Sequence, residues 1–151
     1  MKNKIMIVLV SCLVSAGLHG YLAMHYYPIK FASSTAQSMC NVGEKLNCDA
    51  VSASSYSAFL GIPMAVWGLC SNLILFLMVL FYWWRMSDHP ARLGRWALVL
   101  ASLQFLASIV MATISLTLMS TYCLFCIILY ALSILIFDLL RRSQEEPVLK
   151  N

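Results

Sequence analysis

The sequence predicts an all-α integral membrane protein: a four-transmembrane-helix bundle with both termini cytoplasmic and a long external loop between helices 1 and 2. Three observations predict this fold class. Of the 151 residues, 62% are apolar and only 11% are charged, whereas about a quarter of the residues are charged in ordinary soluble domains. Four stretches are long enough to cross a bilayer, which takes about 20 mostly apolar residues. The basic residues gather on one side of those stretches.

This composition excludes several classes of protein. A soluble domain of this length needs polar residues to cover its surface, and ten Lys and Arg, six Asp and Glu and three His are too few. Disorder requires low hydrophobicity and high charge. The net charge of +4 is spread in small clusters, whereas nucleic-acid-binding proteins carry a basic face. We therefore expect the lipid bilayer as a partner and no nucleic acid.

The four predicted spans take up most of a single membrane domain that comprises the whole chain. They cover residues 5–26, 60–84, 96–119 and 122–140. The longest connection, residues 27–59, is rich in Ser, Ala and Asn, and we expect it to be external. Residues 85–95 contain Asp88, Pro90 and Gly94, which favour a turn.

The distribution of Lys and Arg predicts the orientation. Lys30 and Lys45 lie in the predicted external loop. The other eight basic residues lie on the opposite side: Lys2, Lys4, Arg85, Arg92, Arg95, Arg141, Arg142 and Lys150. The positive-inside rule places these eight in the cytoplasm. The basic start of the chain resembles a secretory signal, but its apolar stretch continues to about Met24 without a polar linker, so we expect a retained helix.

The predicted topology sorts the six cysteines into two groups. Two lie inside spans, where a free cysteine behaves as a small apolar residue: Cys12 and Cys70. Four lie on the external side: Cys40, Cys48, Cys123 and Cys126. Disulfides form and persist outside a bacterial inner membrane or in the ER lumen. Because the orientation argument uses no cysteine, the grouping supports it independently.

Cys123-Leu124-Phe125-Cys126 is a C-x-x-C motif at the external start of the fourth span. Residues three apart share a helix face, so the two sulfurs can meet. The unpaired N–H groups and positive dipole of a helix start stabilise a thiolate, the nucleophile of disulfide exchange. We interpret the motif as redox-active. A structural disulfide is the alternative, and a zinc site of all four external cysteines is disfavoured because the C-x7-C spacing of Cys40 and Cys48 is unusual for zinc. No metal is expected.

Cys40 and Cys48 enclose Gly43, which can supply the turn that brings them together. Alone, this pair would suggest a structural disulfide. Because a second cysteine pair lies on the same side, an electron relay through the two pairs is the better hypothesis. The external pair, Cys40 and Cys48, can exchange with a soluble protein and then with the embedded pair, Cys123 and Cys126. The embedded pair can meet a lipid-soluble electron carrier.

The sequence resembles the vitamin K epoxide reductase family, most closely its bacterial branch. The resemblance rests on Cys48-Asp49-Ala50-Val51-Ser52-Ala53-Ser54-Ser55-Tyr56, Phe59-Leu60-Gly61-Ile62-Pro63 and Trp67-Gly68. It also rests on the order of the motifs, a cysteine pair in the first external loop and then C-x-x-C opening the last helix. Many bacterial relatives carry a fused thioredoxin-like domain, and we expect this protein to use a separate thioredoxin-like partner instead.

The resemblance implies a four-helix bundle around a quinone, ubiquinone or menaquinone. Cys40 and Cys48 would be the shuttle pair, Cys123 would exchange with Cys48, and Cys126 would face the quinone. A thioredoxin-like, DsbA-like periplasmic protein would donate electrons in trans. The implied function is quinone-dependent thiol–disulfide oxidoreduction that supports disulfide bond formation, in a bacterial inner membrane with the redox cysteines on the periplasmic side.

The resemblance also suggests residues that bind the quinone. Ser54, six residues after Cys48, matches a family serine whose hydroxyl could donate to a quinone oxygen. Tyr130, four residues after Cys126, matches a family tyrosine and shares the helix face of that cysteine. Phe59 and Trp67 could wall the quinone pocket, and interhelical packing is the alternative for both. Met64 stands where vertebrate members have an asparagine that contacts the naphthoquinone, which favours quinone reduction over epoxide reduction.

Three other functions stay open. A vitamin K epoxide or quinone reductase proper is one, and a non-enzymatic membrane scaffold or assembly subunit with structural disulfides is another. A DsbB-type enzyme does similar chemistry, but its C-x-x-C lies in the first external loop, which is the reverse of the order here. His19, an ionisable residue inside a span, is a functional candidate by position, and we favour a neutral histidine packed toward the bundle.

Overall fold

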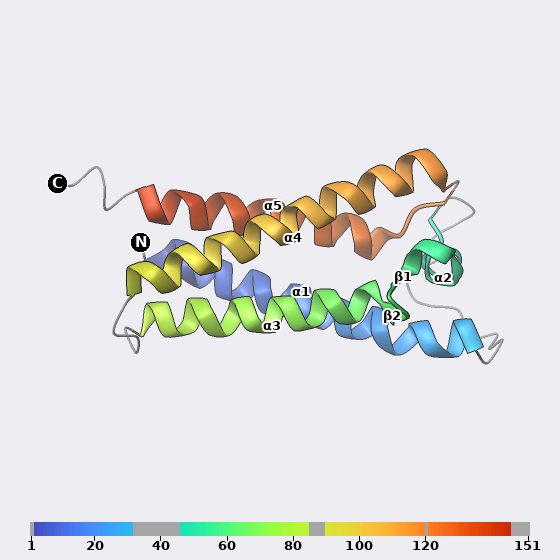
Figure 1. Ribbon diagram of the computed structural model, residues 1–151, viewed down its shortest axis with the longest axis horizontal. Helices are drawn as coiled ribbons and strands as arrows, with labels where there is room; N and C mark the ends of the chain where they lie inside the picture. Colours follow the sequence, from blue (N-terminus) through green and yellow to red (C-terminus); the bar gives the residue numbers. More distant parts are fainter. Residues whose placement is uncertain (1, 32–45, 85–89, 120, 146–151) are drawn as a thin grey trace.

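Four long helices make up most of the described part of the chain. The computed structural model describes residues 2–31, 46–84, 90–119 and 121–145. The long helices run side by side (Figure 1) and are α1 (Lys2–Phe31), α3 (Met64–Trp83), α4 (Pro90–Leu118) and α5 (Leu124–Glu145). The start of α1 and the end of α5 lie at the same end of the bundle. The predicted all-α, four-helix architecture is confirmed.

A small cap covers the other end of the bundle (Figure 1). It consists of the short helix α2 (Cys48–Ala53), a 3-10 turn at Ser55–Ser57, and the antiparallel strands β1 (Ala58–Phe59) and β2 (Ile62–Pro63). Leu60 and Gly61 connect the strands with positive φ angles of 53° and 78°. This hairpin leads directly into α3.

All four long helices are apolar enough to cross a membrane. Their most apolar 18-residue windows have mean hydropathies of 2.0, 2.2, 2.2 and 2.3 in chain order. In α1, 44% of that window is buried inside the protein, against 17%, 11% and 17% in α3, α4 and α5. The outer three helices therefore present most of their apolar surface outward, where only lipid can cover it. The chain is a multi-pass membrane protein.

The packing centres on α1, which contacts α3, α5 and α2, while α4 contacts α3 and α5. The core at the end that carries the chain termini contains Val8, Cys12, Leu75, Val79 and Ile136, which are all almost completely buried. Cys12 therefore packs as the sequence predicted.

The structure corrects several sequence-based expectations. Helix α4 begins at Pro90, so the turn predicted for residues 85–95 is wrong from that residue on. Proline is well tolerated at the first position of a helix because its missing N–H has no intrahelical partner there. Helix α1 continues to Phe31, past the predicted start of the loop. Cys70 is exposed on the outside of α3 rather than packed inside the bundle.

Close packing of α1 against α3 generates a prediction about two glycines. A Cβ atom at Gly68 would collide with the imidazole of His19, whereas one at Gly17 would meet nothing within 4 Å. The imidazole is held by a 2.8 Å bond from Nδ1 to the Ser15 carbonyl. We expect Gly68→Ala to lower the melting temperature in detergent by several degrees, about 1 kcal/mol or more, as overpacking does.

Gly17→Ala is the matched control. It makes the same substitution on a helix but only adds helix propensity, so its melting temperature should be unchanged or slightly higher. Equal melting temperatures for the two variants would contradict the close contact between Gly68 and His19.

Candidate functional site

A short backbone connection brings the segment before α2 against the start of α5. Leu46 and Tyr122 form a parallel β-bridge, and the Asn47 N–H donates to the Tyr122 carbonyl at 2.9 Å. The Asn47 side chain also caps α2 by accepting from the Ala50 N–H at 2.9 Å, which is a favourable N-cap arrangement. Cys48 thus opens α2 next to the residue that precedes α5.

Two sulfurs meet at this junction. The Sγ atoms of Cys123 and Cys48 are 3.1 Å apart, and the residues are only 2% and 1% exposed. Cys48 is disulfide-bonded, while Cys123 and Cys126 are free thiols. A free thiol thus lies in contact with a disulfide sulfur, which is the arrangement that thiol–disulfide exchange requires. Cys40 lies outside the described residues.

The start of α5 stabilises a thiolate on Cys123. The Cys126 thiol, donating to Cys123, is the largest cause that lowers the Cys123 pKa below its ordinary value. The backbone N–H groups of Cys126 and Phe125 act in the same direction, and the Cys126 N–H lies 3.3 Å from the sulfur. Burial and the Asp49 charge oppose them. The free thiol that touches Cys48 is therefore also the activated one.

A cavity of about 350 Å³ lies behind the C-x-x-C motif and is walled by all four long helices and the cap. Cys123, Cys126 and Tyr130 contribute to its wall. The other residues on its wall are Ser15, His19, Leu22, Tyr26, Val51, Ser52, Ser57, Pro63, Met64, Ala65, Trp67, Gly68, Ser71, Asn72, Leu100, Leu103, Gln104, Ala107, Ser108, Met111, Leu129 and Ser133. Most of this lining is apolar, as in typical ligand pockets.

The vitamin K epoxide reductase family model matches residues 6–140, which is most of the chain. The chain belongs to the vitamin K epoxide reductase family. The resemblance predicted from the order of the cysteine pairs is thereby confirmed. A search of curated proteins finds no significant match.

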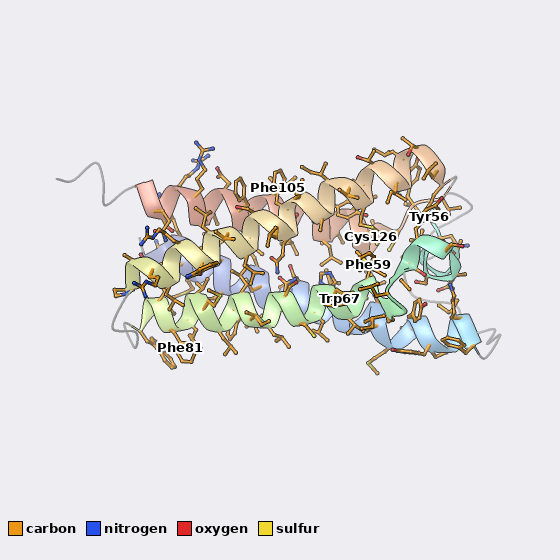
Figure 2. The ribbon with its side chains drawn as sticks, in the orientation of Figure 1. Tyr56, Phe59, Trp67, Phe81, Phe105 and Cys126 are labelled. Atoms are coloured by element: carbon orange, nitrogen blue, oxygen red, sulfur yellow. The ribbon has the colours of Figure 1, made fainter. Side chains whose placement is uncertain are left out.

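The family resemblance suggested four quinone-binding residues, and the structure places two of them on the cavity wall. Tyr130 and Trp67 line the cavity. Ser54 does not, because its hydroxyl ends α2 by donating to the Val51 carbonyl at 2.7 Å. Phe59 is 59% exposed in β1, and its carbonyl faces the Trp67 indole N–H at 3.4 Å. Cys126, Phe59 and Trp67 gather at the end of the bundle that carries the cap (Figure 2).

Sequence reasoning missed the polar residues in the middle of the cavity. Asn72 and Gln104 lie on the cavity wall within α3 and α4. Their signal was present in the sequence, because a polar amide inside a membrane span is costly and therefore a functional candidate. His19 lies on the same wall, and its Nδ1 donates to the Ser15 carbonyl. Among the described residues, no group of three or more His, Cys, Asp or Glu could hold a metal ion.

The sulfur contact predicts a specific cross-link. In the double variant Cys40→Ala/Cys126→Ala, both alternative partners are removed, so mild oxidation should join Cys48 to Cys123 in high yield. Their Sγ atoms are 3.1 Å apart and need to move only about 1 Å to reach bonding distance. Peptide mass spectrometry after non-reducing digestion measures the product.

Cys12 and Cys70 serve as internal controls, since both remain in this variant and neither touches the site. A Cys123 that stays unpaired, or that pairs with Cys70, would show that the contact is not formed in the membrane.

The hydrogen bond from Cys126 predicts a change in the titration of Cys123. Because that donor is the largest cause that lowers the Cys123 pKa, Cys126→Ala should raise it. Less thiolate is then present at any given pH, and alkylation of Cys123 should need a higher pH than in the wild type. Residue-resolved mass spectrometry after iodoacetamide pulses across pH measures the midpoint, with Cys70→Ala as the control. An unchanged or lower midpoint in Cys126→Ala would refute the role of the hydrogen bond.

Proposed function

We propose that this protein is a quinone-dependent thiol–disulfide oxidoreductase of the bacterial inner membrane. It reoxidises a periplasmic thioredoxin-like, DsbA-like protein and passes the electrons through Cys40–Cys48 and Cys123–Cys126 to ubiquinone or menaquinone. Both termini are cytoplasmic in this proposal. The observation that carries it is the 3.1 Å contact between the free Cys123 thiol and the disulfide-bonded Cys48.

The first step takes place on the external side. A thiolate of the reduced partner attacks the Cys40–Cys48 disulfide and forms a mixed disulfide. The partner's second thiolate then attacks its own bonded sulfur and releases the loop cysteine. Two electrons and two protons pass to the loop pair, and the partner leaves with a disulfide.

The second step moves the electrons to the embedded pair. The Cys48 thiolate attacks Cys123 of a Cys123–Cys126 disulfide, and Cys126 leaves as a thiolate. Cys40 then attacks Cys48, and Cys123 leaves. The lowered pKa of Cys123 favours its departure, because a thiol of lower pKa is the better leaving group. The loop pair is oxidised again and the embedded pair is reduced, which agrees with a disulfide-bonded Cys48 beside free Cys123 and Cys126 thiols.

The third step uses the cavity. A quinone held in the cavity would supply the terminal oxidant: the Cys123 and Cys126 thiols would close to a disulfide, and the ring would take up their two electrons and two protons. Cys126 and Tyr130 lie one turn apart on the same wall, so the tyrosine hydroxyl can hydrogen-bond to a ring oxygen near the thiol. A cavity of about 350 Å³ falls in the range of about 300–1,000 Å³ found for ligand pockets. The apolar wall, to which Trp67 contributes, suits an apolar ring.

Ser54 and Phe59 remain predictions as quinone-binding residues. Neither residue lies on the cavity wall.

The alternative functions fit the site less well. A purely structural disulfide at Cys48 would not require a free, activated thiol in contact with it. Met64 stands on the cavity wall where vertebrate members have an asparagine, and a thioether cannot donate a hydrogen bond to an epoxide oxygen. The site therefore favours quinone reduction coupled to disulfide formation.

Quinone reduction by the purified protein tests this function, with a reduced thioredoxin-like dithiol as the electron donor. We expect steady turnover in the wild type and only the uncatalysed background in Cys123→Ala, because this variant removes the sulfur that contacts Cys48. Cys126→Ala should also stop turnover while its loop pair still exchanges with the donor. Cys70→Ala, which removes an exposed cysteine on the outside of α3, should keep the wild-type rate.

Turnover that survives in Cys123→Ala would rule out the relay. A wild type that reduces no quinone, with a Cys48 disulfide that resists the donor, would favour the structural scaffold.

A further inference from the structure

Two buried polar atoms on the cavity wall have no hydrogen-bond partner within the described part of the chain. They are Oδ1 of Asn72 and Nε2 of Gln104. The residues come from different helices, α3 and α4, and both line the cavity behind the C-x-x-C motif. Buried polar groups are nearly always paired, and the hydrocarbon region offers no water in exchange. These unpaired amide atoms on the cavity wall therefore indicate that a ligand in the cavity forms hydrogen bonds with them.

The hydrogen bond of Asn72 determines which atom of its amide still needs a partner. Its Nδ2 donates to the Gly68 carbonyl at 2.9 Å, which fixes the orientation of the amide. The remaining atom, Oδ1, is an acceptor only and needs a donor. The residue is 5% exposed, so bulk solvent does not supply one. Gln104 Nε2 is a donor and needs an acceptor.

These atoms lie deeper in the bundle than the thiols. Gln104 is 14 residues before Leu118, the last residue of α4 at the cap end, which corresponds to about 21 Å along the helix axis. Asn72 is eight residues beyond Met64, the first residue of α3 at the cap, which corresponds to about 12 Å along the helix axis. Cys126 is only three residues into α5 from the same end. A ligand that touches Cys126 and extends inward thus reaches the two amides with its far side.

We propose that Asn72 and Gln104 form a second polar subsite, which binds the ring oxygen of a two-carbonyl acceptor that lies away from Cys126. This inference rests on the proposed function. Gln104 Nε2 donates to the carbonyl of the oxidised ring, and Asn72 Oδ1 accepts from the hydroxyl that replaces that carbonyl on reduction. One donor and one acceptor in the same cavity thus suit both redox states of one ring oxygen.

Equilibrium binding to protein in lipid nanodiscs tests the subsite without turnover, with empty nanodiscs subtracted. The probes are a dimethylnaphthoquinone whose free ring carbons are blocked against thiols, its hydroquinone, and the tetralone analogue that has a single carbonyl. Gln104→Met keeps the volume of the side chain and removes its hydrogen-bonding atoms. Gln144→Met makes the same change near the end of α5, away from the cavity.

We expect Gln104→Met to weaken the quinone about three- to tenfold, the worth of one neutral hydrogen bond, and to leave the tetralone unchanged. Asn72→Leu should weaken the hydroquinone more than the quinone. Gln144→Met should bind all three probes like the wild type. If Asn72→Leu does not fold, the comparison of probe binding by Gln104→Met, Gln144→Met and the wild type tests the subsite on its own.

The subsite is overturned if Gln104→Met binds the quinone like the wild type, or if it weakens quinone and tetralone equally, which would reflect pocket shape. It is also overturned if the wild type binds no quinone. The proposed function fails separately, if the wild type binds the quinone with the expected dependence on Gln104 but does not reduce it with a dithiol donor.

Discussion

The arrangement of the site depends on one backbone junction, where the residues before α2 join the start of α5. The Asn47 N–H bonds the Tyr122 carbonyl, and the Asn47 side chain caps α2. These bonds fix Cys48 and Cys123 against each other although they are 75 residues apart in sequence. Leu22 of α1 and Leu129 of α5 pack around the two sulfurs and complete a buried cluster. Water is thereby kept from the sulfurs where exchange would occur.

The bilayer imposes the second constraint. Three of the four long helices bury less than a fifth of their most apolar windows inside the protein, so lipid covers most of their surface and the protein-facing surface is small. Polar side chains on these helices need hydrogen-bond partners within their own helix. Ser102 and Ser108 find them by donating to the carbonyl four residues earlier. One atom of each of two amides, Oδ1 of Asn72 and Nε2 of Gln104, departs from this rule within the described part of the chain, and both residues lie on the cavity wall. The departure singles out the cavity as the place where a polar ligand group is needed.

Much of the fold could be predicted from the sequence because hydropathy alone identifies a membrane span. The start of α4 could not, because Pro90 is typical both of a turn and of a first helical position. For the cysteines too, the sequence predicts some features and not others. Their order predicted the family, and the resemblance implied that Cys123 exchanges with Cys48, whereas the 3.1 Å contact between these two sulfurs follows only from the packing. Ser54 illustrates the limit, since its spacing from Cys48 is typical of the family while its hydroxyl is engaged by Val51.

The two cysteines of the C-x-x-C motif lie in different surroundings. Cys123 precedes the first residue of α5 and meets the cap, whereas Cys126 lies within the span and meets the cavity. One helical turn therefore separates the sulfur that contacts Cys48 from the sulfur that lines an apolar pocket. In the proposed function, dithiol exchange with the Cys40–Cys48 pair and reduction of a lipid-soluble ring need different surroundings, and a single cysteine could not lie in both. The three-residue spacing keeps the two thiols within hydrogen-bonding reach of each other while each keeps its own environment.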